Sequence, residues 1–260
     1  DPLDLIDGIA LAPDGLFIQS DDLPDGGTGP DSGTVWRVPT VGSPQVIVTG
    51  LGREAGIALA AHEGVDHLSF TGSPATGSIV AQEAAKRHCP VTLELGGKGP
   101  QLVFADADLD AAVPVIVNAI VQNAGQTCSA GSRLLVERSR YEELLEKLSA
   151  AFRALTVGPA LDDRDCGPLI RASQLDRVKG FLADAARDKL TLAGQGTIVP
   201  GAPSSGYYVA PTLVRDVPPV SRLAREEVFG PVLAAMPFDD EAHAVKLANG
   251  TDFGLVAGVW

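Results

Sequence analysis

Cys128 lies in the stretch NAIVQNAGQTCSAGSRLLVE, among Gly, Ser, Thr and Ala residues, and is one of only three cysteines in the chain. A cysteine that serves as core packing normally behaves as a small hydrophobe among apolar neighbours. Small neighbours leave a reagent room to reach the sulfur, and an accessible thiolate is a strong nucleophile. The pattern therefore indicates a nucleophilic thiol at Cys128, whereas Cys89 and Cys166 are predicted to be buried or incidental.

A second candidate is Glu94, which closes the apolar strand pattern VTLEL just before a pair of glycines. Loss of hydration in such surroundings raises the pKa of a carboxyl group towards the range that suits a general base. The alternative is an ion pair with Lys98 at the end of the strand, and for the glutamate taken alone this alternative is favoured. Lys98 itself is predicted to be a solvated surface charge.

Glycine-rich turns and an acidic pair could bind a cofactor. VTGLGREAG and SFTGSPATG each lie between a predicted strand and a predicted helix, where backbone N–H groups favour anions. Neither turn is a GxGxxG fingerprint, and each could be no more than a tight connection. In REEVFGPVL, a carboxylate beside Phe229 could bind ribose hydroxyls, although such acidic pairs more often start a helix.

The elements that position these residues alternate between strand and helix from about residue 50. The predicted strands are VDHLSF, PVTLEL, SRLLVE and two more near 207–214 and 232–238. The predicted helices are REAGIALAAH, SPATGSIVAQEAAKRH, DLDAAVPVIVNAIVQNAGQ, RYEELLEKLSAAFRAL and one near 240–249. This alternation is typical of an α/β fold with a parallel sheet covered by helices.

One helix start has a recognisable signal. Ser139 and Glu142 have the spacing of a capping box. They precede a helix in which Leu144, Leu148, Phe152 and Leu155 fall on one face.

Residues 1–50 have a different texture, with short strand patterns, turn-rich loops and no helical period. The pentapeptide GIALA occurs at 8–12 and again at 56–60, an offset of 48 that is close to the length of a propeller blade. The segment resembles one blade of a gluconolactonase-like β-propeller. A coincidental repeat of common small residues is an equal alternative.

The formal net charge of −13 argues against nucleic acid and anionic membranes as partners, because both are polyanions. No apolar run reaches the length of a membrane span, and no Cys/His cluster indicates a metal. Few cysteines and no signal segment favour a cytoplasmic protein. The chain starts at Asp1 and stops within a predicted strand, so both ends are expected to be truncated.

The motifs FTGS, LELGGK, GQTCSAGSR and EEVFGPV, taken in this order, resemble the NAD(P)-dependent aldehyde dehydrogenase superfamily. Cys128 follows Glu94 by 34 positions, which also matches. The resemblance runs from about Leu51 to Trp260. It implies a partial Rossmann-type cofactor domain at 51–95 and an α/β catalytic domain at 96–260, after the β-rich segment 1–50.

The resemblance also implies a role for each motif. Cys128 would attack an aldehyde to give a thiohemiacetal, its own backbone N–H would stabilise the oxyanion, and hydride transfer to NAD or NADP would leave a thioester. Glu94 would activate the water that releases the carboxylic acid. The implied cofactor-binding residues are Gly52 and Gly56 near the adenosine, Gly72 and Ser73 near the pyrophosphate and nicotinamide, Leu95 and Gly96 near the nicotinamide, and Glu227 and Phe229 at the nicotinamide ribose.

Two further roles of the family are vacant in the early part of the chain. The family normally has there a lysine for the adenine ribose and an asparagine for the oxyanion, and residues 1–50 contain neither residue type. One alternative is therefore a catalytically inactive fragment or binding module. Another is a propeller-type sugar-lactone or binding protein. The expected partner is a small-molecule aldehyde, with a possible homo-oligomer.

Overall fold

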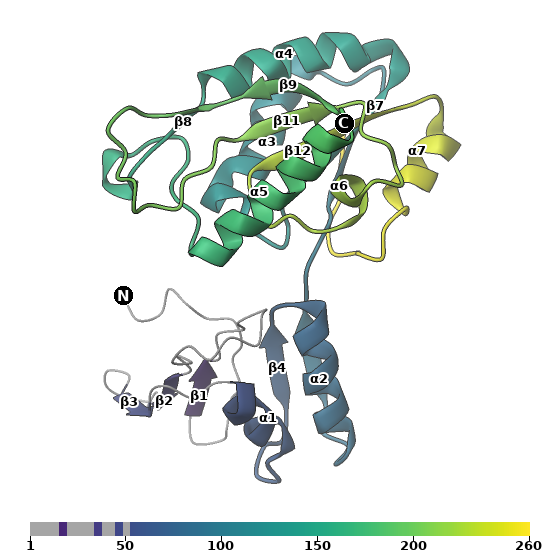
Figure 1. Cartoon of the computed structure of the whole chain (residues 1–260). Coiled ribbons are helices and arrows are strands. Elements are labelled where there is room, and N and C mark those ends of the chain that lie inside the picture. The colour runs from purple at the N-terminus through teal and green to yellow at the C-terminus, as the bar shows by residue number, and fades with distance from the viewer. Residues whose placement is uncertain (1–15, 20–33, 38–44, 49–52) are drawn as a thin grey trace. The chain divides into compact units, whose positions relative to one another are not determined.

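The computed structural model describes residues 16–19, 34–37, 45–48 and 53–260. The chain divides into two compact units, Asp1–Gly96 and Gly97–Trp260, which we call the N-terminal and the C-terminal unit (Figure 1). Both contain helices and strands, as the predicted α/β class requires.

The described part of the N-terminal unit contains a small antiparallel sheet and one βαβ arrangement. Its elements are β1 (Leu16–Gln19), β2 (Thr34–Arg37), β3 (Gln45–Val48), α1 (Arg53–Ala61), β4 (Leu68–Thr71), α2 (Pro74–Ala85) and β5 (Val91–Glu94). Strands β1, β2 and β3 pair antiparallel in that order, whereas β4 and β5 pair in parallel. A small cluster of buried residues lies under α1, α2 and β4, namely Ala60, Val65, Leu68 and Ala84.

The GIALA repeat does not repeat a strand. Its second copy, residues 56–60, lies inside the helix α1, and its first copy lies outside the described residues. A sequence that forms a helix cannot be the edge of a β-blade, so the repeat gives the propeller interpretation no structural basis.

The C-terminal unit is built on a six-stranded sheet of order β13-β6-β7-β12-β11-β9. These strands are β6 (Pro100–Val103), β7 (Arg133–Glu137), β9 (Thr191–Gln195), β11 (Thr212–Arg215), β12 (Val232–Phe238) and β13 (Gly258–Val259). All neighbours are parallel except β9, which pairs antiparallel with β11 at one edge. Two short strands, β8 (Thr156–Val157) and β10 (Thr197–Ile198), form a separate parallel pair.

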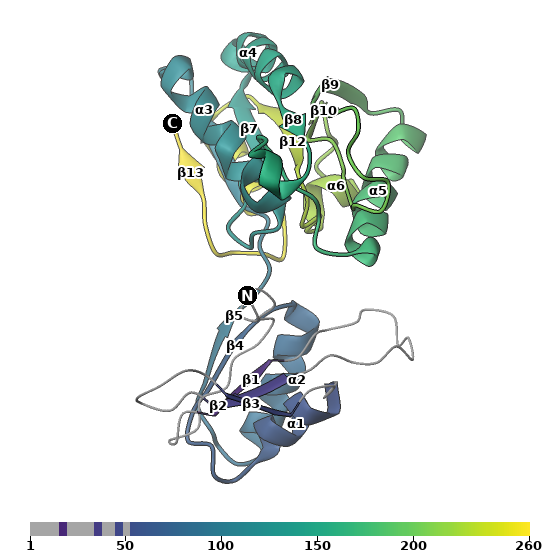
Figure 2. The ribbon, with the colours of Figure 1, turned by 90° about the vertical axis from the view of Figure 1, so that its left-hand side faces the viewer.

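Helices cover both faces of this sheet (Figure 2). They are α3 (Leu109–Val121), α4 (Tyr141–Ala154), α5 (Ala172–Arg187), α6 (Arg222–Arg225) and α7 (Glu241–Ala248), with 3-10 turns at Gln122–Gly125, Arg138–Arg140 and Ala160–Asp162. Along β7 the side chains alternate: Leu134 and Val136 pack in the cluster with α3 and α4, while Leu135 packs in the cluster with α5 and α7. A strand that is apolar on both faces is typical of a parallel sheet between helical layers.

The predicted helical face at 144–155 is confirmed, because Leu144, Leu148 and Phe152 are all fully buried. The predicted capping box is wrong. The N-cap of α4 is Arg140, and the Ser139 hydroxyl donates instead to the Glu137 carboxylate at 3.2 Å. Glu142 is drawn away from the helix start by Arg215 on β11, with which it forms a two-pronged ion pair.

Candidate functional site

Cys128 lies on the loop between α3 and β7, which begins with a left-handed turn. The helix ends at Val121, and Asn123, Ala124 and Gly125 then have φ of 50°, 54° and 74°. Residues other than glycine held in this region cost about 1–3 kcal/mol each, and such strain clusters at functional sites. Cys128, which follows this turn, is half-buried as a residue.

Gln126 braces this turn from both sides. Its side-chain amide donates to the Asn123 carbonyl at 3.1 Å, and the Asn123 amide donates to the Gln126 carbonyl at 2.9 Å. The Gln126 side-chain oxygen accepts the backbone N–H of Ile170 at 2.9 Å. The strained backbone before Cys128 is therefore held by side chains of its own loop and by the segment that leads into α5.

Gly97 connects the cysteine loop to a carboxylate. A Cβ at this position would lie 2.1 Å from the carbonyl oxygen of Cys128, so only glycine allows the two backbones to approach this closely. The N–H of Gly97 donates to Oε1 of Glu227 at 2.9 Å. One glycine therefore contacts both the loop of the predicted nucleophile and the predicted ribose-binding glutamate.

A second glycine contact joins the same two loops. A Cβ on Gly125 would lie 2.2 Å from the carbonyl carbon of Gly230, again a backbone-to-backbone contact. The cysteine loop and the 227–230 loop thus contact each other directly and through Gly97. The C-terminal unit thus brings the Cys128 loop together with Glu227 and Phe229, which lie far from it in the sequence.

Glu227 and Phe229 are held by α5. Phe229 has a φ of 55°, and Gln174 donates from its side-chain amide to the carbonyls of Val228 at 3.1 Å and Phe229 at 2.6 Å. The Arg177 guanidinium donates to the carbonyl of Glu227. The acidic pair does not start a helix, because α6 ends at Arg225, just before it.

Burial raises the pKa of the Glu227 carboxyl above its ordinary value. The Gly97 N–H and the positive charges of Arg177 and Lys98 act in the opposite direction. Glu227 is thus a half-buried carboxylate whose charge depends on its neighbours. Such a group can accept hydrogen bonds from paired hydroxyls, which suits the ribose of a nucleotide.

In the N-terminal unit, the predicted residues Gly72, Ser73, Glu94, Leu95 and Gly96 follow or end two adjacent parallel strands. The N–H of Gly72 donates to the Glu94 carbonyl at 3.0 Å, which places the two strand ends side by side. Ser73 is the N-cap of α2, and its hydroxyl accepts the N–H of Thr76 at 3.2 Å. The carboxyl ends of parallel strands, with a helix N-terminus beside them, are where α/β folds bind nucleotides.

Leu95 is placed by a glycine on α2. A Cβ on Gly77 would lie 2.5 Å from a methyl group of Leu95, so the absence of a side chain there admits the leucine. Leu95 is half-buried, and Glu94 next to it is exposed. The burial that was expected for Glu94 from its apolar neighbours is therefore wrong, because alternate residues of β5 face opposite sides and Glu94 is on the open one.

The predicted turn glycines near the adenosine are not both in a turn. Gly56 is the fourth residue of α1, and Gly52 lies outside the described residues. The helix begins at Arg53, which confirms the helix predicted from REAGIALAAH.

Lys98 contradicts its prediction as a surface charge. Its side chain is 1% exposed, and its Nζ is without a hydrogen-bond partner among the described residues. Burial, with the charge of Arg133 as a second cause, lowers the pKa of the Lys98 ammonium to about 7. Arg133 is also buried, and its Nε donates to the Lys98 carbonyl at 2.9 Å.

The other two cysteines have the surroundings that were predicted for them. Cys166 is buried, and its burial raises the pKa of the thiol to about 11. Cys89 is half-buried and its thiol donates to the carbonyl of Val65 at 3.5 Å. Cys128 is therefore the thiol that the structure places beside other candidate residues.

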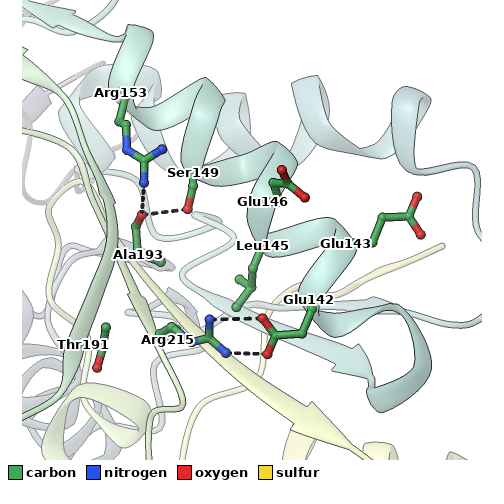
Figure 3. A pocket seen from close by; sticks show the side chains of 9 residues that line it. All are labelled: Glu142, Glu143, Leu145, Glu146, Ser149, Arg153, Thr191, Ala193 and Arg215. Carbon is green, nitrogen blue, oxygen red and sulfur yellow. Dashed lines mark hydrogen bonds and ion pairs between the residues drawn. The ribbon is translucent and has the colours of Figure 1, made fainter.

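An open groove lies elsewhere on the C-terminal unit, between α4 and β9 (Figure 3). Its lining residues are Glu142, Glu143, Leu145, Glu146, Ser149, Arg153, Thr191, Ala193 and Arg215. Ser149 and Arg153 both donate to the Ala193 carbonyl, at 2.7 and 3.2 Å. Glu142 and Arg215 in this lining pair with each other, and none of the lining residues is a predicted site residue.

Two other kinds of feature are absent from the described residues. No group of three or more His, Cys, Asp or Glu residues in this part of the chain could hold a metal ion. No helix in the same part is long and apolar enough to cross a membrane.

Sequence reasoning missed several residues that shape the site. Gln174 and Arg177 on α5 hold the 227–229 loop, and Gly97 and Gly125 admit the close backbone contacts. The glycines had a detectable signal, because each sits one to three residues from a candidate chemical group. Gln174 and Arg177 had no such signal, because their partners are backbone carbonyls 50 to 55 positions further along the chain.

Residues 41–260 match the family described as the aldehyde dehydrogenase family. Over 215 residues the chain is 38% identical to the family protein DhaS of Bacillus subtilis (strain 168), covering 82% of this chain and 43% of that protein. The match starts ten residues before Leu51, so it includes β3. These comparisons give no support to the propeller blade.

Two solved structures are also similar. One is a crystal structure from Burkholderia cenocepacia of a protein assigned to the same family, with 66% identity, a TM-score of 0.81, and coverage of 83% of this chain and 45% of that one. The other is a variant of aldehyde dehydrogenase C (AldC) of Pseudomonas syringae, solved with NAD+ and octanal, with 39% identity, a TM-score of 0.75, and coverage of 82% and 44%. The chain spans less than half the length of each of these relatives.

Proposed function

Because the chain belongs to the aldehyde dehydrogenase family, we propose that it oxidises an aldehyde to a carboxylic acid with transfer of hydride to NAD or NADP. The observation that carries the proposal is the position of Gly97, which contacts the Cys128 loop and donates to Glu227. Gly97 thereby contacts both the loop of the proposed nucleophile and the carboxylate proposed to bind the ribose. The structure of the Pseudomonas syringae variant holds NAD+ and octanal, which supports this proposal.

In this proposal the Cys128 thiolate attacks the aldehyde carbonyl carbon and forms a thiohemiacetal. The oxyanion that develops is stabilised by the backbone N–H of Cys128, one donor of the kind whose loss typically costs about 2.7–4 kcal/mol of transition-state stabilisation. The bound nicotinamide cofactor would supply the acceptor for the hydride. Loss of that hydride leaves the acyl group on Cys128 as a thioester.

Glu94 takes a proton from the water that attacks the thioester, and the acid leaves as the Cys128 thiol is restored. The exposed position of Glu94 on β5 leaves its carboxylate open to water and substrate. Glu227 accepts hydrogen bonds from the ribose hydroxyls, and Phe229 packs beside the ribose. The ends of β4 and β5, at Gly72, Ser73, Leu95 and Gly96, contribute the surface next to the pyrophosphate and the nicotinamide.

The residues present fit these parts of a dinucleotide on their own chemistry. Glu227 is an acceptor held in place by Gly97, and the capped N-terminus of α2 favours the negative charge of a pyrophosphate. Gly52 and Gly56 would lie towards the adenosine. The substrate is a small-molecule aldehyde, and assembly with further copies of the chain is part of the proposal.

The test is aldehyde-dependent NADH formation with short aliphatic aldehydes, aromatic aldehydes and octanal. The Cys128→Ala variant is the test variant. Cys166→Ala is its matched control, because Cys166 is a buried cysteine to which the proposal gives no role. We expect turnover to disappear in the first and to persist in the second. Turnover that survives Cys128→Ala would contradict the mechanism, and a folded wild-type chain without turnover would favour the non-catalytic binding module.

A further inference from the structure

The buried ammonium of Lys98 is not used by the mechanism above, although it lies in the middle of the site's backbone contacts. It follows Gly97, whose N–H holds Glu227, and precedes Gly99, where a Cβ would lie 2.9 Å from the Ala130 carbonyl oxygen. The glycines on either side allow the backbone around Lys98 to lie close to the cysteine loop. The lysine side chain therefore extends from the same short segment that links Cys128 to Glu227.

A charged group in this position is costly. Lys98 is 1% exposed, and Nζ finds no hydrogen-bond partner among the described residues. Isolated charges are rarely buried without a partner, because the lost hydration is worth several kcal/mol. Burial therefore favours the neutral form of this lysine, and nearby negative charges act in the opposite direction.

The charged side chains that act on Lys98 come from three elements: β7, α5 and the loop after α6. Arg133 on β7 and Arg177 on α5 oppose its positive charge, while Glu226 and Glu227 on the loop after α6 favour it. Glu226 is exposed and is engaged with Arg222, whose Nε lies 3.0 Å from its carboxylate. Glu227 is the half-buried one of the two, and its carboxylate carries the larger effect on Lys98.

We propose that Lys98 is a positioning residue for Glu227: together with the Gly97 N–H and Arg177, its buried ammonium keeps the Glu227 carboxylate ionised, and so able to accept hydrogen bonds from a ribose, at the acid end of the working pH range. The proposal rests on the ribose role given to Glu227 above. It assigns to Lys98 an electrostatic action through Glu227 and no contact with substrate.

Lys98 is charged in the same pH range in which Glu227 would otherwise become protonated. Burial favours the neutral form of Glu227. As pH falls, protonation would therefore remove the negative charge with which it accepts hydrogen bonds. Lys98 carries its proton below about pH 7, given the lowered pKa of its ammonium. The positive charge is therefore present in the range in which Glu227 needs it, and it is absent at higher pH, where Glu227 ionises without help.

The coupling is tested by nuclear magnetic resonance titration of the whole chain carrying 13C-labelled lysine and glutamate. The chain has six lysines, and Lys98 is the buried one, so Lys98→Met identifies its signal. We expect Glu227→Gln to lower the midpoint of Lys98 by about one pH unit, and Lys98→Met to raise the midpoint of Glu227 by the same amount. The two shifts must be equal, because coupling between two sites is reciprocal.

Glu226→Gln is the matched control, because Glu226 is the adjacent carboxylate but is exposed and paired with Arg222. We expect it to move Lys98 by much less than Glu227→Gln does. A Lys98 signal that titrates together with the exposed lysines would overturn the proposal. So would a Lys98 midpoint that Glu227→Gln and Glu226→Gln leave equally unmoved.

A second measurement separates this inference from the ribose role itself. The dissociation constant of NAD+ is measured between about pH 5.5 and pH 8.5 for the wild-type chain and Lys98→Met. We expect the variant to bind NAD+ more weakly at the acid end of this range and equally well near pH 8. The loss should approach tenfold only below both midpoints of Glu227, because one pH unit in its ionisation is there a factor of ten. A purely structural lysine would change the affinity by the same factor at every pH, and that result would contradict the proposal.

If the wild-type chain binds NAD+ and Glu227→Gln binds it equally well, the ribose role of Glu227 fails. The Lys98–Glu227 coupling is then still decided by the titration, which uses no cofactor.

Discussion

The two units differ in how completely they bury their residues. In the C-terminal unit the strand β7 is apolar on both faces, and helices pack against each face. In the described part of the N-terminal unit, β4 and β5 pair with each other and the buried cluster has four members. Glu94, Ser73 and Thr71 are exposed there, whereas Lys98, Arg133 and Gln174 are buried in the C-terminal unit.

The same difference applies to the candidate residues of each unit. The C-terminal unit fixes Cys128, Glu227 and Phe229 through strained turns, glycine contacts and buried donors. The N-terminal unit presents Glu94 and Ser73 at the ends of two strands. We therefore expect the geometry at the thiol to be rigid, and that around Glu94 to be easily changed by substitution or binding.

The largest expected effect is on the two cores. Phe152→Ala, in the cluster under α4, should lower the free energy of unfolding of the C-terminal unit by about 3–5 kcal/mol. Leu68→Ala, the matched change in the small cluster, should cost about 2 kcal/mol or less, because fewer neighbours surround the cavity. Amide hydrogen exchange resolved by segment measures both.

The same experiment can break the comparison. Phe152→Ala should speed exchange in 97–260 and leave 53–96 nearly unchanged, if the units are separate in stability as they are in structure. Equal loss of protection in both units would mean that they unfold as one body, and the contrast drawn above would not extend to energetics.

The next effect concerns the backbone contact at Gly97. Gly97→Ala places a methyl group against the Cys128 carbonyl, and the cost of such overpacking is about 1–3 kcal/mol. We also expect a changed rate of alkylation of Cys128 by iodoacetamide, since the loop must shift. Thermal denaturation and mass spectrometry of the alkylated peptides measure the two effects.

Gly180→Ala is the control for that variant. Gly180 lies within α5 and a Cβ there would meet nothing within 4 Å. Alanine should stabilise the helix by roughly 0.5–1 kcal/mol and leave the alkylation of Cys128 unaltered. If Gly97→Ala behaved like Gly180→Ala, the close approach of Gly97 to the cysteine loop would be disproved.

Much of this architecture could be predicted because it follows from local patterns. Periodicity identified β7 and the buried face of α4, and the order of four motifs identified the family. The burial of Lys98 could not be predicted. GGKGP resembles a solvated loop, and the lysine is enclosed only because β7 and the loop after α6 pack around it.

Two other predictions failed for the same reason. Ser139 and Glu142 have the right spacing for a capping box, but Arg215, 73 residues beyond Glu142, takes the carboxylate. Glu94 has apolar neighbours in sequence, yet alternate residues of a strand face opposite sides. Partners distant in the chain decide such cases, and local spacing carries no information about them.

The last expected effect is a pH dependence of stability at Lys98. Its pKa falls from an ordinary 10.5 to about 7 in the folded chain, so the unfolded chain holds the proton more strongly between these values. Wild-type stability should therefore rise with pH across this window. Lys98→Met removes the buried charge and should stabilise the chain by roughly 1–4 kcal/mol near pH 6.

That gain should shrink as pH rises towards 10, because the wild-type lysine is then neutral. Urea denaturation at several pH values measures it, with Lys246→Met, an exposed lysine on α7, as the control. A gain that is independent of pH would mean that Lys98 is not charged in the folded chain at pH 6. Lys98 would then no longer support the contrast between buried charged residues in the C-terminal unit and exposed ones in the N-terminal unit.

The central claim is that Cys128 becomes acylated by an aldehyde and that Glu94 assists the release of the acid. The most direct measurement is mass spectrometry of the Glu94→Gln variant after incubation with NAD+ and octanal, followed by digestion. The account predicts a thioester of the corresponding acid on the peptide that contains Cys128, with Cys166 unmodified. An acyl group on another residue, or a Cys128 peptide that stays free while NADH is formed, would contradict it.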